Sequence, residues 1–159
     1  PGEEGELRVK GRQVCQGYLD SALDADAFDE DGWFRTGDLG VIDAEGFVSI
    51  TGRLKDIIIR KGENISAKEI EDLLFAHPAI ADAAVIGLPD EKSGERACAV
   101  VVCKSDSTIS FDDMVSFLKT AQLSVHKIPE QLEIVTALPR NPSGKVLKKD
   151  LRATYGGAS

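Results

Sequence analysis

The spacing of hydrophobic and polar positions predicts an α+β fold from residue 57 onward. A β-branched run at residues 57–59 precedes a segment that places Ile70, Leu73 and Leu74 on one face of a helix, with Ser66 as its N-cap. Two buried strands, a second capped helix, a further strand and a terminal helix are expected downstream, at residues 83–88, 97–103, 110–118, 132–135 and 145–152. The order β-α-β-β-α-β-α is typical of a compact α+β domain of about 100 residues.

The first third of the chain shows a different, mostly β pattern. Leu7 and Val9 alternate with charged residues, as in a half-buried strand, and an acidic segment at residues 21–28 predicts a short helix. Hydrophobic residues on both sides of an Asp-Ala-Glu-Gly turn predict a hairpin at residues 41–50. Residues 1–50 carry 12 acidic and 4 basic side chains, whereas the rest of the chain carries 15 of each. Pattern and charge together predict two units that meet near residue 50.

The composition argues against several classes of protein. A net charge of −8 disfavours nucleic-acid binding, and the apolar runs are too short for a transmembrane segment. The three cysteines form no CxxC pair, which argues against a zinc site or a disulfide framework and favours a reducing compartment. We therefore expect a cytoplasmic protein. His77 and His126 lack neighbouring ligands or nucleophiles, so we predict structural roles for both and no metal site.

Two segments near the charge boundary suggest ligand binding. Asp38 lies on a predicted turn at residues 32–40, where small neighbours allow a ligand to approach and a carboxylate accepts from a sugar diol. The alternative is a hairpin turn with a solvated carboxylate. Arg53 either binds a phosphate or ribose or forms a surface ion pair in a linker. Lys55-Asp56 is a candidate joint between the two units.

Two further segments lie in the second unit. Residues 60–64 form a predicted tight turn between a buried strand and a capped helix. Residues 139–145 form an exposed loop that presents Lys145 at or just before a helix start. Residues 140–152 hold five bases and one acid, which suits an anionic ligand or, alternatively, a solvated face.

Six short motifs occur in a fixed order along the chain. They are Gly5-Glu6-Leu7, Gly17-Tyr18-Leu19, the Gly-Trp-Phe-Arg-Thr-Gly-Asp run at residues 32–38, Gly52-Arg53 with Lys55-Asp56, Lys61-Gly62, and Pro139-Arg140 with Gly144-Lys145. This ordered set resembles the C-terminal portion of the adenylate-forming (AMP-binding) superfamily, which includes acyl-CoA synthetases, luciferases and peptide-synthetase adenylation domains. Residues 60–66 read Arg-Lys-Gly-Glu-Asn-Ile-Ser, most like a short- or medium-chain or alicyclic acyl-CoA synthetase. Peptide-synthetase domains carry Arg-Gly-x-Arg-Ile-Glu at that place.

The resemblance implies a domain organisation. Residues 1–54 would be the β-rich tail, part of a β-barrel subdomain, of a large N-terminal adenylation domain that ends at the hinge. Residues 55–159 would be the small, mobile C-terminal α+β lid domain, with Lys55 at the hinge. The phosphate loop and the acyl pocket of the family would lie upstream of Pro1, in the missing N-terminal domain. We therefore expect the chain alone to be inactive.

The resemblance also implies roles for individual residues. Asp38 matches the carboxylate that binds the ribose hydroxyls of ATP and AMP, and Arg53 matches the arginine that contacts ribose and phosphate. Gly62 and Glu63 lie on the loop that faces the pantetheine of CoA after the lid rotates. Lys145 matches the lysine that bridges the carboxylate substrate and the α-phosphate during adenylation.

The implied activity is that of an ATP-dependent carboxylic acid–CoA ligase, an AMP-forming acid–thiol ligase. Its substrates would be a small carboxylic acid, ATP and CoA, with Mg²⁺ accompanying ATP and no magnesium ligand identifiable in this chain. Two alternatives stay open: a peptide-synthetase-type adenylation domain, and a non-catalytic nucleotide- or CoA-binding module. Whether the protein forms a homodimer also stays open.

Overall fold

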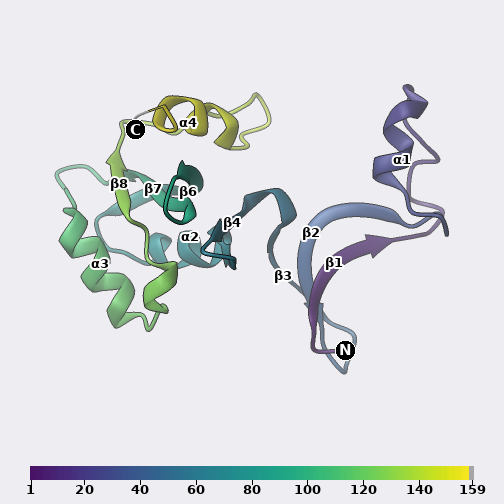
Figure 1. The fold of residues 1–159 in the computed structure, drawn as a ribbon, viewed down its shortest axis with the longest axis horizontal. Helices are drawn as coiled ribbons and strands as arrows, with labels where there is room; N and C mark the ends of the chain where they lie inside the picture. The colour runs from purple at the N-terminus through teal and green to yellow at the C-terminus, as the bar shows by residue number, and fades with distance from the viewer. Residues whose placement is uncertain (158–159) are drawn as a thin grey trace. The chain divides into compact units, whose positions relative to one another are not determined.

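A computed structural model describes residues 1–157, which divide into two compact units (Figure 1). Unit 1 is residues 1–55 and unit 2 begins at Asp56, so the division falls one residue after the boundary expected from the sequence. None of the helices within residues 1–157 is both long and apolar enough to cross a bilayer.

Unit 1 is built on a three-stranded antiparallel sheet in the order β1-β2-β3. The strands are β1 (Glu4–Val9), β2 (Phe34–Ile42) and β3 (Val48–Arg53), and the acidic segment between β1 and β2 forms the helical turns η1 (Ser21–Leu23) and α1 (Asp24–Ala27). The predicted strand, short helix and hairpin are confirmed. Asp43 closes the β2–β3 turn, since its carboxylate accepts from the backbone N–H groups of Glu45 and Phe47.

The predicted turn at residues 32–40 is wrong over most of its length. The tight turn ends near Trp33, whose N–H donates to the Asp29 carboxylate, and Asp38 lies within strand β2. Gly40 is there because the strands approach closely: a Cβ at this position would lie 2.7 Å from the carbonyl oxygen of Ser49. The glycine therefore marks crowding inside a sheet and not a turn.

Unit 2 contains a five-stranded sheet in the order β5-β4-β7-β6, with β8 also pairing with β7. Its strands are β4 (Ile57–Arg60), β5 (Glu63–Ser66), β6 (Ile80–Asp90), β7 (Gly94–Cys103) and β8 (Gln131–Ile134). Strands β6 and β7 form a long hairpin, and β8 runs parallel to β7. The helices are α2 (Ala67–Phe75), α3 (Phe111–Thr120) and α4 (Lys148–Tyr155), with a short 3₁₀ turn η3 (Val125–Lys127). A further 3₁₀ turn, η2 (Leu54–Asp56), spans the division between the units.

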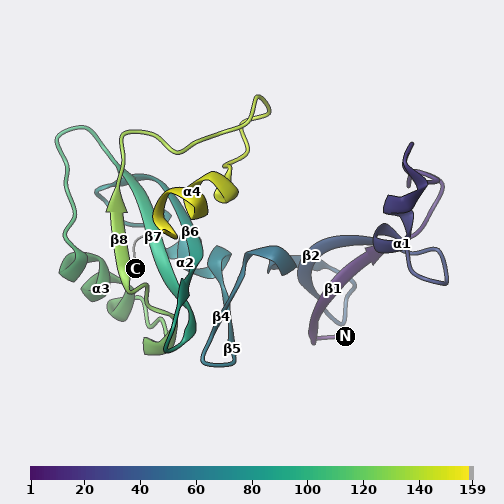
Figure 2. The ribbon, with the colours of Figure 1, turned by 45° about the horizontal axis from the view of Figure 1, so that its top comes forward.

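Side chains alternate along β6 and β7, so the hairpin has an apolar cluster on each of its two faces. One cluster holds Val85 and Ala97 with residues of α2 and α3, including Leu74 and Met114. The other holds Ile86 and Val100 of the strands with Leu151 of α4. Figure 2 shows α4 in yellow against β6 and β7. The predicted α+β class is confirmed.

Two local predictions in unit 2 need correction. Residues 60–64 were expected to be a strand-to-helix turn, but they form a β-hairpin in which β4 and β5 pair through a two-residue turn, Lys61-Gly62. Both turn residues have positive φ, 52° and 82°, as a type I′ hairpin turn requires. Helix α4 begins at Lys148 and not at Lys145, so Lys145 lies in the preceding loop.

Candidate functional site

The site of unit 1 is formed where β2 and β3 pair. Asp38 and Arg53 are cross-strand partners, and Arg53 Nε donates to Asp38 Oδ1 at 2.6 Å. The Asp38 N–H in turn donates to the hydroxyl of Thr36. Both side chains are therefore oriented by strand register and by hydrogen bonds.

A hollow of about 410 Å³ adjoins this pair. It is lined by Glu6, Asp26, Arg35, Thr36, Gly37, Arg53, Leu54 and Lys55. Three basic side chains in one small concavity suit a phosphate, and a neighbouring carboxylate suits a sugar diol. The structure thus brings together three residues singled out from the sequence, Asp38, Arg53 and Lys55, at one end of unit 1.

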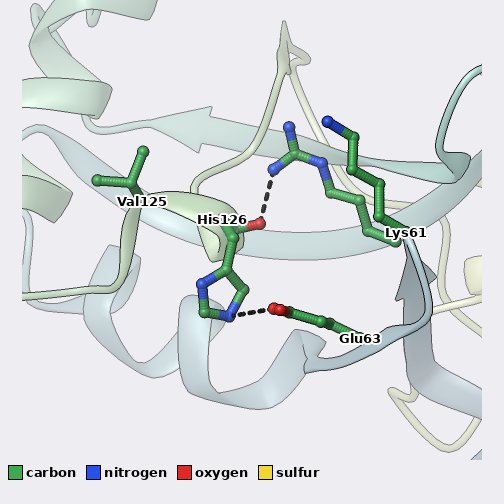
Figure 3. Close-up of a pocket in the computed structure, with 5 residues that line it drawn as sticks. Lys61, Glu63, Val125 and His126 are labelled. Atoms are coloured by element: carbon green, nitrogen blue, oxygen red, sulfur yellow. Dashed lines mark hydrogen bonds and ion pairs between the residues drawn. The ribbon is translucent and has the colours of Figure 1, made fainter.

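The β4–β5 hairpin of unit 2 borders a second pocket, of about 450 Å³. Figure 3 shows Glu63 and His126 pointing toward each other across it, with His126 Nε2 3.0 Å from Glu63 Oε2. Arg60 donates to the carbonyl oxygen of His126 at 2.6 Å and thereby joins η3 to the hairpin. Gly62 is at the tip of the same hairpin, so Gly62 and Glu63 lie together at one exposed edge of unit 2.

The two histidines have different surroundings. His77 matches its predicted structural role, since its Nδ1 accepts from the Ala79 N–H and its ring packs edge-on against Phe117. His126 differs, because its side chain is half exposed and lines the pocket beside Glu63. Glu63 and His126 are far apart in the sequence, and only the tertiary fold brings η3 to the β4–β5 hairpin.

Lys145 lies in a loop whose shape is held by its own hydrogen bonds. Asn141 is at its centre: its side-chain oxygen accepts from the Lys145 N–H at 2.8 Å and from the Ser143 hydroxyl at 2.8 Å. The Asn141 N–H donates to the carbonyl oxygen of Lys145, and Gly144 has φ of 84°. A short polar residue and a glycine thus form a tight loop that leaves Lys145 exposed. The importance of Asn141 was missed from the sequence, although Asn at the start of a turn is a recognisable signal.

The basic run at residues 140–152 is not a patch of five available charges. Arg140 pairs with Asp82, Lys148 with Glu71 and Asp56, and Arg152 with Asp56. Within the described residues, Lys145 and Lys149 form no ion pair, and both are exposed. Of these two cations, Lys145 belongs to the motif at residues 139–145, whereas Lys149 lies on the exposed surface of helix α4, as the alternative of a solvated face predicts.

Residues 1–157 contain no group of three or more His, Cys, Asp and Glu side chains placed to hold a metal ion. The thiol of Cys98 is fully buried, and burial raises its pKa to about 12, which makes it a poor nucleophile.

Comparison with known proteins gives a family match in the second half of the chain. Residues 69–145 match the model of the AMP-binding enzyme C-terminal domain. The matched segment lies within unit 2. The predicted resemblance to the C-terminal portion of adenylate-forming enzymes is thereby confirmed. The matched segment ends at Lys145, whereas Asp38, Arg53, Lys55 and the hairpin tip precede it.

Longer matches extend over both units. The chain is 46% identical over 154 residues to the medium-chain fatty-acid–CoA ligase of Escherichia coli (strain K12). This match covers 96% of this chain and 27% of the ligase. Among solved structures, ATP-bound MatB from Rhodopseudomonas palustris matches with a TM-score of 0.91 and 41% identity, over 98% of this chain and 31% of MatB. Apo MatB matches over the same shares at 42% identity, with a TM-score of 0.70. The chain thus spans less than a third of each of these relatives.

Proposed function

We propose that this chain is the C-terminal part of an ATP-dependent carboxylic acid–CoA ligase. The enzyme would first join the acid to AMP with release of pyrophosphate, and then transfer the acyl group to the thiol of CoA. The observation that carries the proposal is the 46% identity to a fatty-acid–CoA ligase across 96% of the chain. The remaining catalytic parts, including an acyl pocket, would belong to an N-terminal domain upstream.

In this proposal, Asp38 and Arg53 bind the nucleotide. A carboxylate accepts hydrogen bonds from two vicinal hydroxyls, so Asp38 would bind the ribose, while the guanidinium of Arg53 would contact ribose and phosphate. Their 2.6 Å ion pair supports these roles, since it holds both groups in place before a ligand arrives. The match to ATP-bound MatB over both units also supports them.

Lys145 would act in the first half-reaction. When a carboxylate oxygen attacks the α-phosphorus, negative charge builds on the phosphoryl oxygens as pyrophosphate leaves. An ammonium group between the two anions would neutralise their repulsion and stabilise that transition state. The exposure of Lys145 and its lack of an ion-pair partner within residues 1–157 support this role, because its charge is available to a ligand.

Lys55 would be the hinge at which unit 2 rotates between the first and the second half-reaction. Gly62 and Glu63 would face CoA in the second half-reaction. The division of the chain into two compact units directly after Lys55 supports a hinge at this residue. The pocket beside Glu63 and His126 offers a concave surface on the side proposed for CoA. Magnesium would accompany ATP, and within residues 1–157 no group of three or more His, Cys, Asp and Glu side chains is placed to hold it.

The test uses the full-length protein that contains this chain and a panel of carboxylic acids. We expect acid-dependent pyrophosphate exchange, and AMP and a CoA thioester when CoA is added. Exchange without a CoA thioester would instead support a carrier-protein thiol as acceptor. Nucleotide or CoA binding without exchange for any acid would support the non-catalytic module. The polypeptide of residues 1–159 is the control, and we expect no exchange from it.

A further inference from the structure

Helix α4 is fastened to the rest of unit 2 by a cluster of ion pairs at its first turn. Lys148 Nζ lies 2.7 Å from Glu71 Oε1 and 3.6 Å from Asp56 Oδ2, and Arg152 Nη2 lies 3.4 Å from Asp56 Oδ1. The side chains of Lys148, Glu71 and Asp56 are only 16%, 17% and 20% exposed. Water and salt screen such pairs less than they screen surface pairs, so the cluster constrains where the helix begins.

The carboxylate of Glu71 is itself held by the main chain. Glu71 Oε1 accepts from the backbone N–H of Val85 at 2.7 Å, which ties helix α2 to strand β6. Lys148 therefore bonds to a fixed acceptor and not to a mobile surface carboxylate. Its second partner, Asp56, is the first residue of unit 2 and directly follows the proposed hinge residue Lys55.

The loop that carries Lys145 is held at its other end as well. Arg140 donates to Asp82 of strand β6, and the Leu147 N–H donates to the carbonyl oxygen of Pro139 at 2.8 Å. Within residues 1–157, Lys145 is thus an exposed cation without an ion-pair partner, and it lies between two ion-paired ones, Arg140 before it and Lys148 after it. The arrangement distinguishes one base that faces solvent from two that fix the backbone around it.

We propose that Lys148 is a positioning residue for Lys145, and that its ion pairs with Glu71 and Asp56 fix the loop for acyl-adenylate formation. This inference rests on the proposed function of Lys145. It assigns to Lys148 no contact with substrate, although its charge and its place three residues after Lys145 would suggest one. The ammonium group of Lys148 forms ion pairs with two carboxylates of unit 2, those of Glu71 and Asp56.

The cluster has a consequence for the hinge. Without the ion-pair cluster, the Lys145 loop would be linked to the proposed hinge only through the strands and helices that lie between them in the chain. The ion pair of Asp56 with Lys148, at 3.6 Å, links the first residue after the proposed hinge to the helix that follows the loop. Lys145 would then move with unit 2 as one rigid body, and would leave the adenylation site as soon as the hinge turns.

The test compares four variants of the full-length protein. Lys148→Met removes the charge and keeps the length of the side chain, whereas Lys148→Arg keeps a cation that can reach both carboxylates. Lys149→Met removes the next charge along the same helix turn. Lys68→Met removes an exposed ion pair, with Asp72, elsewhere in unit 2. Each is assayed for acyl-adenylate formation, for thioester formation from supplied acyl-adenylate, and for amide hydrogen exchange in the peptide that contains residues 139–147.

For Lys148→Met we expect acyl-adenylate formation to fall by roughly 10²-fold, the loss that about 1 Å of misplacement can cause. Thioester formation should stay near the wild-type rate, and exchange in the loop should become faster. Lys148→Arg should recover most of the activity, and both control variants should behave like wild type. Equal losses in both half-reactions, unchanged loop exchange in Lys148→Met, or the same loss in Lys149→Met would overturn the inference. If the wild-type protein forms no acyl-adenylate, the proposed function fails, while the exchange measurement still decides whether Lys148 holds the loop.

Discussion

Units 1 and 2 are both built on a β-sheet, antiparallel in unit 1 and mixed in unit 2, but they differ in what the sheets bury. Within residues 1–55, Gly40 and Gly52 are the only fully buried residues, and large side chains such as Phe47 and Ile50 are 70% and 55% exposed. Unit 2 buries an apolar cluster on each face of the β6–β7 hairpin. Strand pairing is thus the main source of order within residues 1–55, whereas packed apolar clusters add to it in unit 2.

The two candidate sites differ in the same way. Asp38 and Arg53 owe their geometry to strand register, which a sheet without a core maintains only weakly. Lys145 is in a loop that packed strands and ion pairs hold on both sides. From this comparison we expect the Lys145 loop to keep its geometry when unit 2 is isolated. The Asp38–Arg53 site should need additional parts of the protein to keep its geometry.

The largest expected effect is on folding of the separated units. A polypeptide that begins at Asp56 should unfold cooperatively on heating, because each face of its sheet is covered by helices. Residues 1–55 alone should show no cooperative transition. Circular dichroism against temperature measures both, and a cooperative transition from residues 1–55 would show that strand pairing is sufficient.

The second prediction concerns Lys145 in the full-length protein. Lys145→Ala should reduce acyl-adenylate formation by about 10²–10³-fold, the usual cost of removing one transition-state donor. Thioester formation from supplied acyl-adenylate should remain close to wild type, because the lid would have rotated by then. Lys149→Ala is the matched control, since Lys149 is also exposed and unpaired within the described residues. Wild-type adenylation by Lys145→Ala would remove the catalytic assignment.

How far the sequence predicted this structure depends on how local each signal was. Ser66 and Ser110 cap their helices as expected, because a cap involves residues only three apart. The strands at residues 83–88 and 97–103 are confirmed within longer ones, since buried runs bounded by polar residues are strong signals.

The missed features depend on partners distant in the chain. Asp38 was placed on a turn because its glycine neighbours indicate one, whereas pairing with β3 decides that it lies in a strand. The pairing of His126 with Glu63 and the neutralisation of Lys148 by Glu71 follow no sequence spacing at all. Such contacts become visible only once the sheet brings its edges together.

A third prediction tests the contrast in cores directly. In the 159-residue chain, Leu74→Ala should reduce the free energy of unfolding by about 2–5 kcal/mol, because it opens a cavity in a packed cluster. Ile50→Ala, at a side chain that is 55% exposed, should change it by less than about 0.5 kcal/mol. Urea denaturation measures both, and similar losses for the two variants would mean that unit 1 has a core of its own.

A fourth prediction concerns the residue between the units. Lys55→Pro would fix φ near −65° and so restrict a hinge that must swing. In the full-length protein we expect one half-reaction to lose about tenfold more rate than the other, a difference of about 1.4 kcal/mol. Lys55→Ala is the control, because it removes the side chain but leaves φ free. Equal losses of both half-reactions in Lys55→Pro would indicate a structural role.

The smallest expected effect is at the N-terminus of helix α3, which belongs to the packed unit. The Ser110 hydroxyl accepts from the Asp113 N–H and donates to the Asp113 carboxylate at 2.6 Å. This side-chain hydrogen bond, with a further one from the Ser110 N–H, lowers the pKa of Asp113 below its ordinary value of 3.8. Ser110→Ala should cost about 1 kcal/mol of stability near neutral pH.

The same variant makes a prediction about pH. Since the pKa of Asp113 is lower in the folded state, the ionised carboxylate stabilises the fold above the unfolded pKa, and this contribution is lost as pH falls through the folded pKa. Ser110→Ala should therefore raise the pKa of Asp113 toward 3.8. The difference in the free energy of unfolding between wild type and the variant should become smaller as the pH falls into the acid range. Asp90 is the internal control, because its pKa is lowered chiefly by the hydroxyl of Ser93, which the substitution leaves in place. Carboxyl-carbon NMR titration follows both groups at once, and an unchanged pKa of Asp113 would show that the capping hydroxyl is not what lowers it.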